Sequence, residues 1–447
     1  MSYQNPLDLY TKLYNNYDYA YLLESVEGPQ KLAEFSFIGF NPKKIILTKN
    51  GKTEILERKS RHTIRSDNPL EAIEKEIHAN KVPNYTFRLI GGAVGYISYD
   101  AIRYWETLPN TTIDDLNLPD IEMGIYDDGI IFDHRGKKAY YYFINERRFN
   151  ELQEKLQKTL LNNENTTIRY DKPGLNICKE DFEESVRKAK QYIFDGDIFQ
   201  VVLSKRYEFN LTGNLINFYK ALRSINPSPY MYFLKHGDRQ IIGSSPEMLV
   251  RVDREQVETY PIAGTRPVVE DQNKNKILEE ELLSDQKERA EHTMLVDLAR
   301  NDIGRVSENG SVAVPEFMTV HQFSHVQHIV SRVVGHMSPS RDCFDALRVM
   351  LPAGTVSGAP KVRAMELIEE LEPTRRGPYA GAVGYFSYNG NADFAITIRT
   401  LVAQCDRAYI QVGAGIVADS DPEHEWFETE NKAEALMKAL SQVGEKI

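Results

Sequence analysis

Hydrophobic spacing divides this chain into amphipathic helices and short strands. In residues 179–197, Phe182, Val186 and Ala189 recur at helical spacing until an Asp-Gly-Asp turn ends the pattern. The apolar run 198–209 that follows predicts a buried strand. Helix and strand signals in one chain of 447 residues predict a large α+β protein.

Three further segments carry strand patterns. Residues 130–144 predict a hairpin around Arg135-Gly136. Residues 314–337 are rich in β-branched side chains and alternate in part, and residues 407–420 predict a strand that ends in glycines.

One short sequence occurs twice. GGAVGYISYD at 91–100 is nearly repeated by AGAVGYFSYN at 380–389. Small residues followed by alternating aromatic residues are typical of strands that another layer approaches closely. Chance similarity is one explanation, and the other is a duplication that gives two related α+β halves whose sheets face each other. We expect an N-terminal half, 1–161, a polar linker, 162–174, and a C-terminal half, 175–447.

Two pairs of glutamates, each spaced by three residues, lie far apart in the sequence. They are Glu288 with Glu291 and Glu425 with Glu428, and Lys432 follows one turn later. In a helix this spacing places both members of a pair on one face. Four converging carboxylates repel one another unless a cation joins them, and such ligands suit Mg²⁺. The alternative is a solvated helix face with Glu–Lys pairs.

Other segments are candidates for binding an anion. Residues 351–371 contain a Gly/Ser-rich turn that runs into a helix with Pro360 in its first turn, where free N–H groups would face an anion. A capped helix with a tight loop explains the pattern equally well. Arg399 interrupts an apolar strand, and a buried guanidinium requires an anionic partner. Gly413 and Gly415 indicate either close approach to a planar ligand or a bulge.

Composition and charge limit the cellular compartment and the kinds of partner that we expect for this protein. Asp and Glu outnumber Lys and Arg by 65 to 54, and the net charge of −11 argues against nucleic acid or an anionic membrane as partner. No run approaches the ~20 apolar residues of a membrane span, and the N-terminus lacks the pattern of a signal peptide. Cys178, Cys343 and Cys405 have neither metal-site spacing nor a disulfide framework. We expect a cytoplasmic protein.

Ordered motifs along the chain carry a family resemblance. Within 180–440 they are PSPYMYF, SSPEMLV, PIAGTRP, DQKERAEHTMLVDLARND, LPAGTVSGAPK, RRGPYAGAVGY and GAGIVADSDPEHEWFETENKA. The N-terminal half adds LLESVEG, FSFIGFNP and GYISYDAIRYWE. Together these motifs resemble the chorismate-utilising enzyme family. The resemblance implies an α+β fold in which two facing antiparallel sheets form a sandwich with helices outside.

The resemblance also implies roles for single residues. Glu291 and Glu428 would bind Mg²⁺, and Glu288 and Glu425 would support its water shell. The catalytic residues would be Glu247, as general acid for the departing C4 hydroxyl of chorismate, His328, which assists loss of pyruvate, and Thr265. The substrate-binding residues would be Gly264, Thr265, Tyr379, Arg399, Gly413, Ala414, Gly415 and Lys432. A satisfied strand histidine and an exposed strand-end acid are the alternatives for His328 and Glu247.

Two positions separate the branches of this family. Relatives that add water have a lysine base where this chain has Gln200, and relatives that make 4-amino-4-deoxychorismate commonly have a lysine where it has Ala263. Without either lysine, the resemblance implies that ammonia attacks C2 and that loss of pyruvate gives anthranilate. The aminodeoxychorismate branch, an enzyme that stops at the aminated intermediate, and a non-catalytic chorismate- or tryptophan-binding regulator remain alternatives.

The source of ammonia and a regulator follow from the same resemblance. No cysteine lies in a glycine-flanked nucleophile turn, so a separate glutamine amidotransferase subunit is implied. Two segments resemble the family's pocket for L-tryptophan as inhibitor, with core packing between the halves as the alternative. The pocket residues would be Glu24, Ser25, Asn226, Pro227, Pro229, Tyr230 and Met231.

Overall fold

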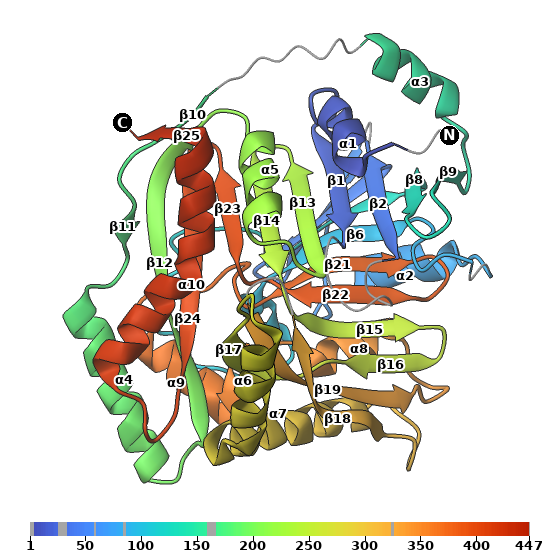
Figure 1. Ribbon diagram of the computed structural model, residues 1–447. Helices are drawn as coiled ribbons and strands as arrows, with labels where there is room; N and C mark the ends of the chain where they lie inside the picture. Colours follow the sequence, from blue (N-terminus) through green and yellow to red (C-terminus); the bar gives the residue numbers. More distant parts are fainter. Residues whose placement is uncertain are drawn as a thin grey trace.

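Two large, mostly antiparallel sheets pack face to face, with helices on their outer sides (Figure 1). This computed structural model describes residues 4–25, 34–57, 60–83, 86–158, 167–322 and 326–446. The α+β sandwich expected from the family resemblance is therefore confirmed.

The first sheet has the strand order β25-β10-β12-β24-β23-β14-β13-β1-β2-β8-β9, and β11 and β20 also pair with β12. Its strands are β1 (Tyr19–Glu24), β2 (Phe35–Phe40), β8 (Asp128–Asp133), β9 (Lys138–Phe143), β10 (Ile168–Tyr170), β11 (Gly174–Leu175), β12 (Gln200–Thr212), β13 (Tyr230–His236), β14 (Arg239–Ser245), β20 (Gly358–Ala359), β23 (Thr400–Gln404), β24 (Arg407–Ile416) and β25 (Gly444–Lys446).

The second sheet has the strand order β17-β19-β16-β15-β22-β21-β6-β7-β3-β4-β5, and β18 pairs with β19. Its strands are β3 (Lys44–Lys49), β4 (Lys52–Glu57), β5 (Ser60–Arg65), β6 (Gly92–Ile97), β7 (Ile121–Tyr126), β15 (Met248–Asp253), β16 (Gln256–Thr259), β17 (Ile262–Pro267), β18 (Ala313–Gln322), β19 (Val326–His336), β21 (Ala382–Ser387) and β22 (Ala392–Ile396).

The helices lie outside this sandwich or at its open end (Figure 1). They are α1 (Pro6–Tyr14), α2 (Glu71–Ala79), α3 (Phe149–Lys158), α4 (Lys179–Phe194), α5 (Ile216–Ile225), α6 (Gln272–Ser284), α7 (Gln286–Gly304), α8 (Cys343–Met350), α9 (Lys361–Leu371) and α10 (Pro422–Val443), with short 3₁₀ helices η1 (Tyr99–Tyr104) and η2 (Gly354–Val356). None of the helices in the described ranges is long and apolar enough to cross a membrane.

Alternation along each strand divides the core into three layers. In β13, Tyr232 belongs to the aromatic cluster between the sheets, while its neighbour Phe233 faces the layer of α1, α5 and α10. In β21, Tyr385 points between the sheets and Phe386 joins the cluster under α8. Each sheet is therefore apolar on both faces, which explains strands without a polar side.

The two copies of the repeated sequence pair with each other across the predicted halves. Strand β6, from the first copy, pairs antiparallel with β21, from the second, and Gly95 lies opposite Gly384. A side chain on Gly95 would come within 2.0 Å of the Glu122 carbonyl, so close strand packing requires glycine there. Because β1 also pairs with β13, each sheet contains strands from both predicted halves.

Several sequence predictions can be compared with these elements. Helix α4 and the hairpin of β8 and β9 lie where they were expected, whereas 314–337 is an antiparallel pair, β18 and β19. Of the predicted linker, 162–166 lies outside the described residues, and Ile168–Tyr170 is strand β10. The division at 162–174 remains a prediction.

Candidate active site

One cavity collects the predicted catalytic residues. It has a volume of about 220 Å³ and lies where β17, β24, η2 and α10 meet the loops that follow β14 and β22. The lining residues are Val202, Pro246, Glu247, Ile262, Ala263, Gly264, Thr265, His328, Thr355, Val356, Tyr379, Ile398, Arg399, Gln411, Val412, Gly413, Gly415 and Lys432. All of them come from the predicted C-terminal half.

Glu247 is a buried carboxyl group on the cavity wall. It lies in the tight connection from β14 to β15, where its carbonyl accepts a hydrogen bond from the Ile396 N–H at 3.1 Å. Burial raises its pKa to about 8, although the Thr355 hydroxyl, which donates to Oε1 at 2.8 Å, and the charge of Lys432 act in the opposite direction. Burial is the cause of this shift. Glu247 is therefore protonated at neutral pH.

His328, on β19, also lines the cavity, and residues of β17 hold its ring. Its Nδ1 is 2.8 Å from the carbonyl oxygen of Gly264 and 3.1 Å from the Thr265 hydroxyl. A carbonyl oxygen can only accept, so Nδ1 carries a proton and Nε2 holds the lone pair of the neutral ring. Burial lowers the pKa of His328, which keeps the ring neutral.

Arg399 presents an uncompensated cation to the cavity. It lies in the turn after β22 rather than within a strand, as the sequence had suggested, and has φ of 51°. The Ser244 N–H donates to its carbonyl at 3.1 Å and fixes this turn. No carboxylate in the described part of the chain pairs with its guanidinium, whose pKa is lowered by burial and raised by Tyr379. A half-buried guanidinium in this state fits an anionic ligand.

Glycines in β24 bring backbone to the cavity. A Cβ on Gly413 would lie 2.6 Å from the Tyr379 hydroxyl, and one on Gly415 would lie 2.6 Å from Gln200 Nε2. The Lys432 ammonium donates to the Gly413 carbonyl at 2.9 Å. Ala414 lies between these glycines, is fully buried and packs into the core instead of lining the cavity.

Capped helix starts position both glutamate pairs. Asp285 accepts hydrogen bonds from the backbone N–H groups of Lys287 and Glu288, which begins α7. Asp421 caps α10 in the same way, with Pro422 as its first residue. The pairs therefore lie in the first two turns of their helices, and both segments are helical as the sequence predicted.

The carboxylates of the two helices act on one another. Burial, followed by the charges of Glu288 and Glu428, raises the pKa of Glu291, although Gln200 Nε2 donates to its Oε1 at 3.2 Å. Burial also raises the pKa of Glu425, and Glu428 adds to this effect. Glu291 of α7 and Glu428 of α10 thus approach closely enough to interact.

One buried carboxylate oxygen in this set is available to a hard cation. Glu428 pairs with Lys432 at 2.6 Å and Glu288 with Arg266 at 3.2 Å, and the described ranges contain no group of three or more His, Cys, Asp or Glu side chains with metal-site geometry. The Oε2 atom of Glu425 is nevertheless buried without a hydrogen-bond partner. A buried carboxylate oxygen is costly to leave without a partner, and a cation such as Mg²⁺ would satisfy it.

Known proteins are similar to this chain along its whole length. The chorismate binding enzyme family matches residues 18–438. The chain belongs to this family. A relative named anthranilate synthase component 1 from Methanothermobacter marburgensis is 47% identical over 100% of this chain and 95% of its own. A relative of the same name from Acetivibrio thermocellus is 48% identical over 99% of this chain and 94% of its own.

Solved structures of family members agree with the fold. The crystal structure of anthranilate synthase component I from Streptococcus pneumoniae TIGR4 matches with a TM-score of 0.81 and 40% identity, covering 92% of this chain and 93% of that one. The menaquinone-specific isochorismate synthase from Escherichia coli matches with a TM-score of 0.74 and 18% identity, covering 98% of this chain and 91% of that one, which shows a shared fold alone.

The family motifs did not point to every polar group of the cavity. Thr355 lies in the glycine-rich segment 351–371, but it reaches the cavity from η2, not from the start of α9. Pro360 is the residue that precedes α9 instead of lying in its first turn. Gln411, whose Nε2 donates to Ser204 at 2.8 Å, shares one face of β24 with the two glycines, so strand alternation was the signal for it.

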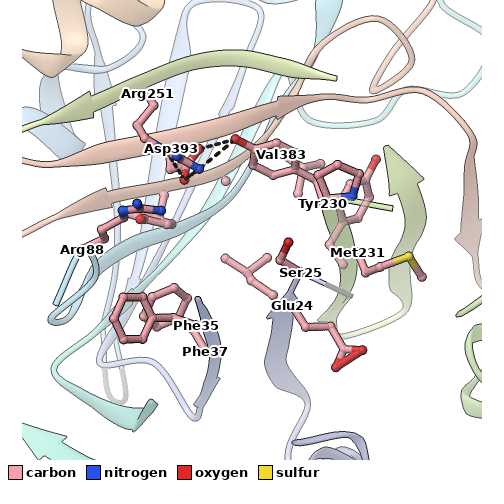
Figure 2. Close-up of a pocket in the computed structure, with 15 residues that line it drawn as sticks. Glu24, Ser25, Phe35, Phe37, Arg88, Tyr230, Met231, Arg251, Val383 and Asp393 are labelled. Atoms are coloured by element: carbon pink, nitrogen blue, oxygen red, sulfur yellow. Dashed lines mark hydrogen bonds and ion pairs between the residues drawn. The ribbon is translucent and has the colours of Figure 1, made fainter. Parts of the chain in front are cut away.

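A second pocket lies between the two sheets, where the halves of this family member meet (Figure 2). Asp393 accepts from Arg251 at 2.8 Å and from the Tyr230 hydroxyl at 2.9 Å, and these bonds form one wall. Of the residues predicted to bind tryptophan, Asn226 and Pro227 are not on its lining. The lining residues are Leu23, Glu24, Ser25, Phe35, Phe37, Arg88, Pro229, Tyr230, Met231, Tyr232, Arg251, Val383, Gly384, Tyr385 and Asp393.

Proposed function

We propose that this chain is component 1 of an anthranilate synthase and converts chorismate and ammonia to anthranilate, pyruvate and water. Relatives that share 42–48% of its residues over 93–100% of the chain carry that name. The observation that carries the chemistry is that one cavity holds a protonated buried acid, Glu247, and an uncompensated cation, Arg399.

In this proposal, a different cationic side chain of the cavity binds each of the two carboxylates of chorismate. Arg399, with Tyr379 and the backbone at Gly415, holds the enolpyruvyl carboxylate, because no carboxylate among the described residues has to be displaced from the guanidinium. Lys432, fixed to the Gly413 carbonyl, adds positive charge on the side of the ring carboxylate. Gly264 and Thr265 line the ring.

Acid and base chemistry fall to two residues. Glu247 donates its proton to the C4 oxygen as that oxygen leaves, since a carboxyl group with a pKa of about 8 is protonated at neutral pH. His328 assists the later loss of pyruvate, because its neutral ring has a lone pair on Nε2 with which to accept a proton.

The metal assignment follows the four glutamates. Glu291 and Glu428 hold Mg²⁺, and Glu288 and Glu425 support its water shell, consistent with the unsatisfied oxygen of Glu425. Bound Mg²⁺ supplies positive charge to the ring carboxylate of chorismate.

Two uncharged side chains define the nucleophile. Gln200, the site of a water-activating lysine in relatives that add water, donates to Glu291, and Ala263 lines the cavity without an amine. Lys432 is already bound to Glu428 and the Gly413 carbonyl. Ammonia is therefore the nucleophile, attacking C2.

Partners, regulation and location complete the proposal. A glutamine amidotransferase subunit supplies ammonia, because Cys178, Cys343 and Cys405 are free thiols far from any nucleophile motif. L-tryptophan inhibits by binding in the second pocket, which contains five of the seven residues expected for it. The reaction takes place in the cytoplasm.

Product analysis tests the proposal directly. Purified protein is incubated with chorismate, Mg²⁺ and excess ammonium at alkaline pH, and the expected products are fluorescent anthranilate and one equivalent of pyruvate. A product that is aminated at C4 and retains its enolpyruvyl group would assign the chain to the aminodeoxychorismate branch, and one aminated at C2 that retains this group would show an enzyme that stops at the aminated intermediate. No consumption of chorismate would leave only a binding role.

A further inference from the structure

Arg266 binds acidic side chains of two helices to the strand that borders the cavity. Its guanidinium lies 3.3 Å from Glu281 on α6, 3.2 Å from Asp285 at the start of α7 and 3.2 Å from Glu288 in the first turn of α7. It also donates to the carbonyl of Thr265 at 3.0 Å, and the side chain is largely buried. Four of the five N–H donors of a guanidinium suffice for these contacts.

Glu288 connects this cluster to the cavity. One of its oxygens accepts from Arg266, and the other would lie 2.9 Å from a Cβ placed on Gly264, which lines the cavity. Glu288 also lies one turn before Glu291 on the same face of α7. The carboxylate of Glu288 therefore lies close both to the cavity wall at Gly264 and to the neighbouring carboxylate of Glu291.

We propose that Arg266 is a positioning residue that fixes Glu288 and offsets its negative charge, so that anionic chorismate binds beside four glutamates. This inference rests on the proposed function. At the ~4 Å separation of such groups, the interaction between unit charges at a protein surface is large enough to alter ligand binding. The guanidinium therefore favours an anion in the cavity and opposes a cation at the glutamates.

Opposite responses of the two ligands distinguish this role from simple support of the fold. Removal of the positive charge makes the glutamate cluster more negative, so a divalent cation binds more tightly and chorismate binds more weakly. Loosening of α7 without an electrostatic effect weakens both ligands together. Lysine keeps the charge but, as a single ammonium, cannot bridge three carboxylates and a carbonyl at once.

The test compares Arg266→Met, Arg266→Lys and a matched control, Arg300→Met. Arg300 lies on the same helix, and among the described residues its one ion pair is with the exposed Asp297. Mn²⁺ serves as the probe for a hard cation, with its affinity measured by electron paramagnetic resonance in the absence of chorismate. KM for chorismate, kcat and the melting temperature are measured on the same preparations.

For Arg266→Met we expect the Kd for Mn²⁺ to fall by about three- to tenfold while KM for chorismate rises by about three- to tenfold. Arg266→Lys keeps the affinity for Mn²⁺ and recovers part of the KM, and Arg300→Met changes neither. Parallel weakening of both ligands in Arg266→Met, or no change in either, would overturn the inference. If the wild type makes no anthranilate, chorismate affinity measured by calorimetry replaces KM, so a failure of the proposed function is seen separately.

Discussion

The reactivity of single residues in this protein is set by what surrounds them. Glu247 and Glu434 are the same residue type, but Glu247 is buried and its pKa rises to about 8, while Glu434 is exposed. His328 is kept neutral by burial and oriented by the Gly264 carbonyl. Arg399 stays available because no carboxylate of the described residues reaches it.

The hydroxyl of Thr355 is expected to set the alkaline limit of activity. It donates to Glu247 and favours the ionised form, so Thr355→Val raises the pKa of Glu247 further, by about one unit. Glu247 acts in its protonated form, and activity is lost as pH rises through its pKa. The alkaline limb of kcat/KM for chorismate, measured at constant free ammonia, therefore moves to higher pH. Thr355→Ser should keep the wild-type profile, and an unmoved limb in Thr355→Val contradicts the assignment.

Glu428→Gln is expected to abolish turnover without changing the fold. The substitution removes one of two carboxylates assigned to Mg²⁺ and leaves the shape of the side chain, so anthranilate formation falls by at least about 100-fold. Glu434→Gln, an exposed position on the same helix, is the control and should keep full activity. Fluorescence of anthranilate and circular dichroism are the measurements. Near-normal turnover in Glu428→Gln would refute the metal assignment.

At the scale of elements, a buried lysine fixes the rotation of the second glutamate helix. The side chain of Lys205, on β12, is fully buried. Its ammonium lies 3.1 Å from the centroid of the Trp426 ring and pairs with Glu430, four residues later on α10. Trp426 and Glu430 face β12. Glu428 and Lys432 therefore lie on the side of α10 that faces the cavity. Helical spacing predicts which residues share a face, but this contact decides where that face points.

Replacement of Lys205 by methionine should destabilise the protein without leaving an empty cavity in the core. Methionine has a similar length but gives up the contact with the Trp426 ring and the ion pair with Glu430, which together are worth about 2 kcal/mol. Urea unfolding, followed by tryptophan fluorescence and circular dichroism, measures the loss. Lys188→Met, an exposed site on α4, is the control and should change the free energy of unfolding by less than about 0.5 kcal/mol. Equal stability of the two variants would show that Lys205 does not hold α10.

At the scale of the whole molecule, the two pockets are lined by different parts of the chain. The cavity is lined only from Val202 to Lys432, whereas the second pocket takes its lining from both halves, which meet where β1 pairs with β13 and β6 with β21. The pockets share no lining residue. Arg251, in the lining of the second pocket, lies on β15, and Glu247, in the lining of the cavity, lies just before this strand.

Ser25 offers a test of this separation. Ser25→Leu extends an apolar side chain into the second pocket and should relieve inhibition by L-tryptophan, raising its half-inhibitory concentration by at least about tenfold. The rate without tryptophan should remain within about twofold, because no lining residue of the cavity is changed. Both values come from one titration of anthranilate formation. Unchanged inhibition would place the tryptophan site elsewhere.

The sequence by itself determined the local features of this protein. Periodicity located α4, the hairpin of β8 and β9 and the strand β24, and the repeated motif marked the two strands that join the halves. Ordered motifs indicated the family and the candidate catalytic residues that the cavity collects, because such motifs retain the residue types that the chemistry requires. These features depend on spacing along the chain, which a sequence contains in full.

Only the tertiary structure decided what depends on contacts between distant segments. It placed the Thr355 hydroxyl against the Glu247 carboxyl group, packed Ala414 into the core, and buried Glu247, which raises the pKa of this residue. It also distributed the strands of each half over both sheets. Burial, charge pairing and strand order arise from segments up to hundreds of residues apart, so no local pattern specifies them.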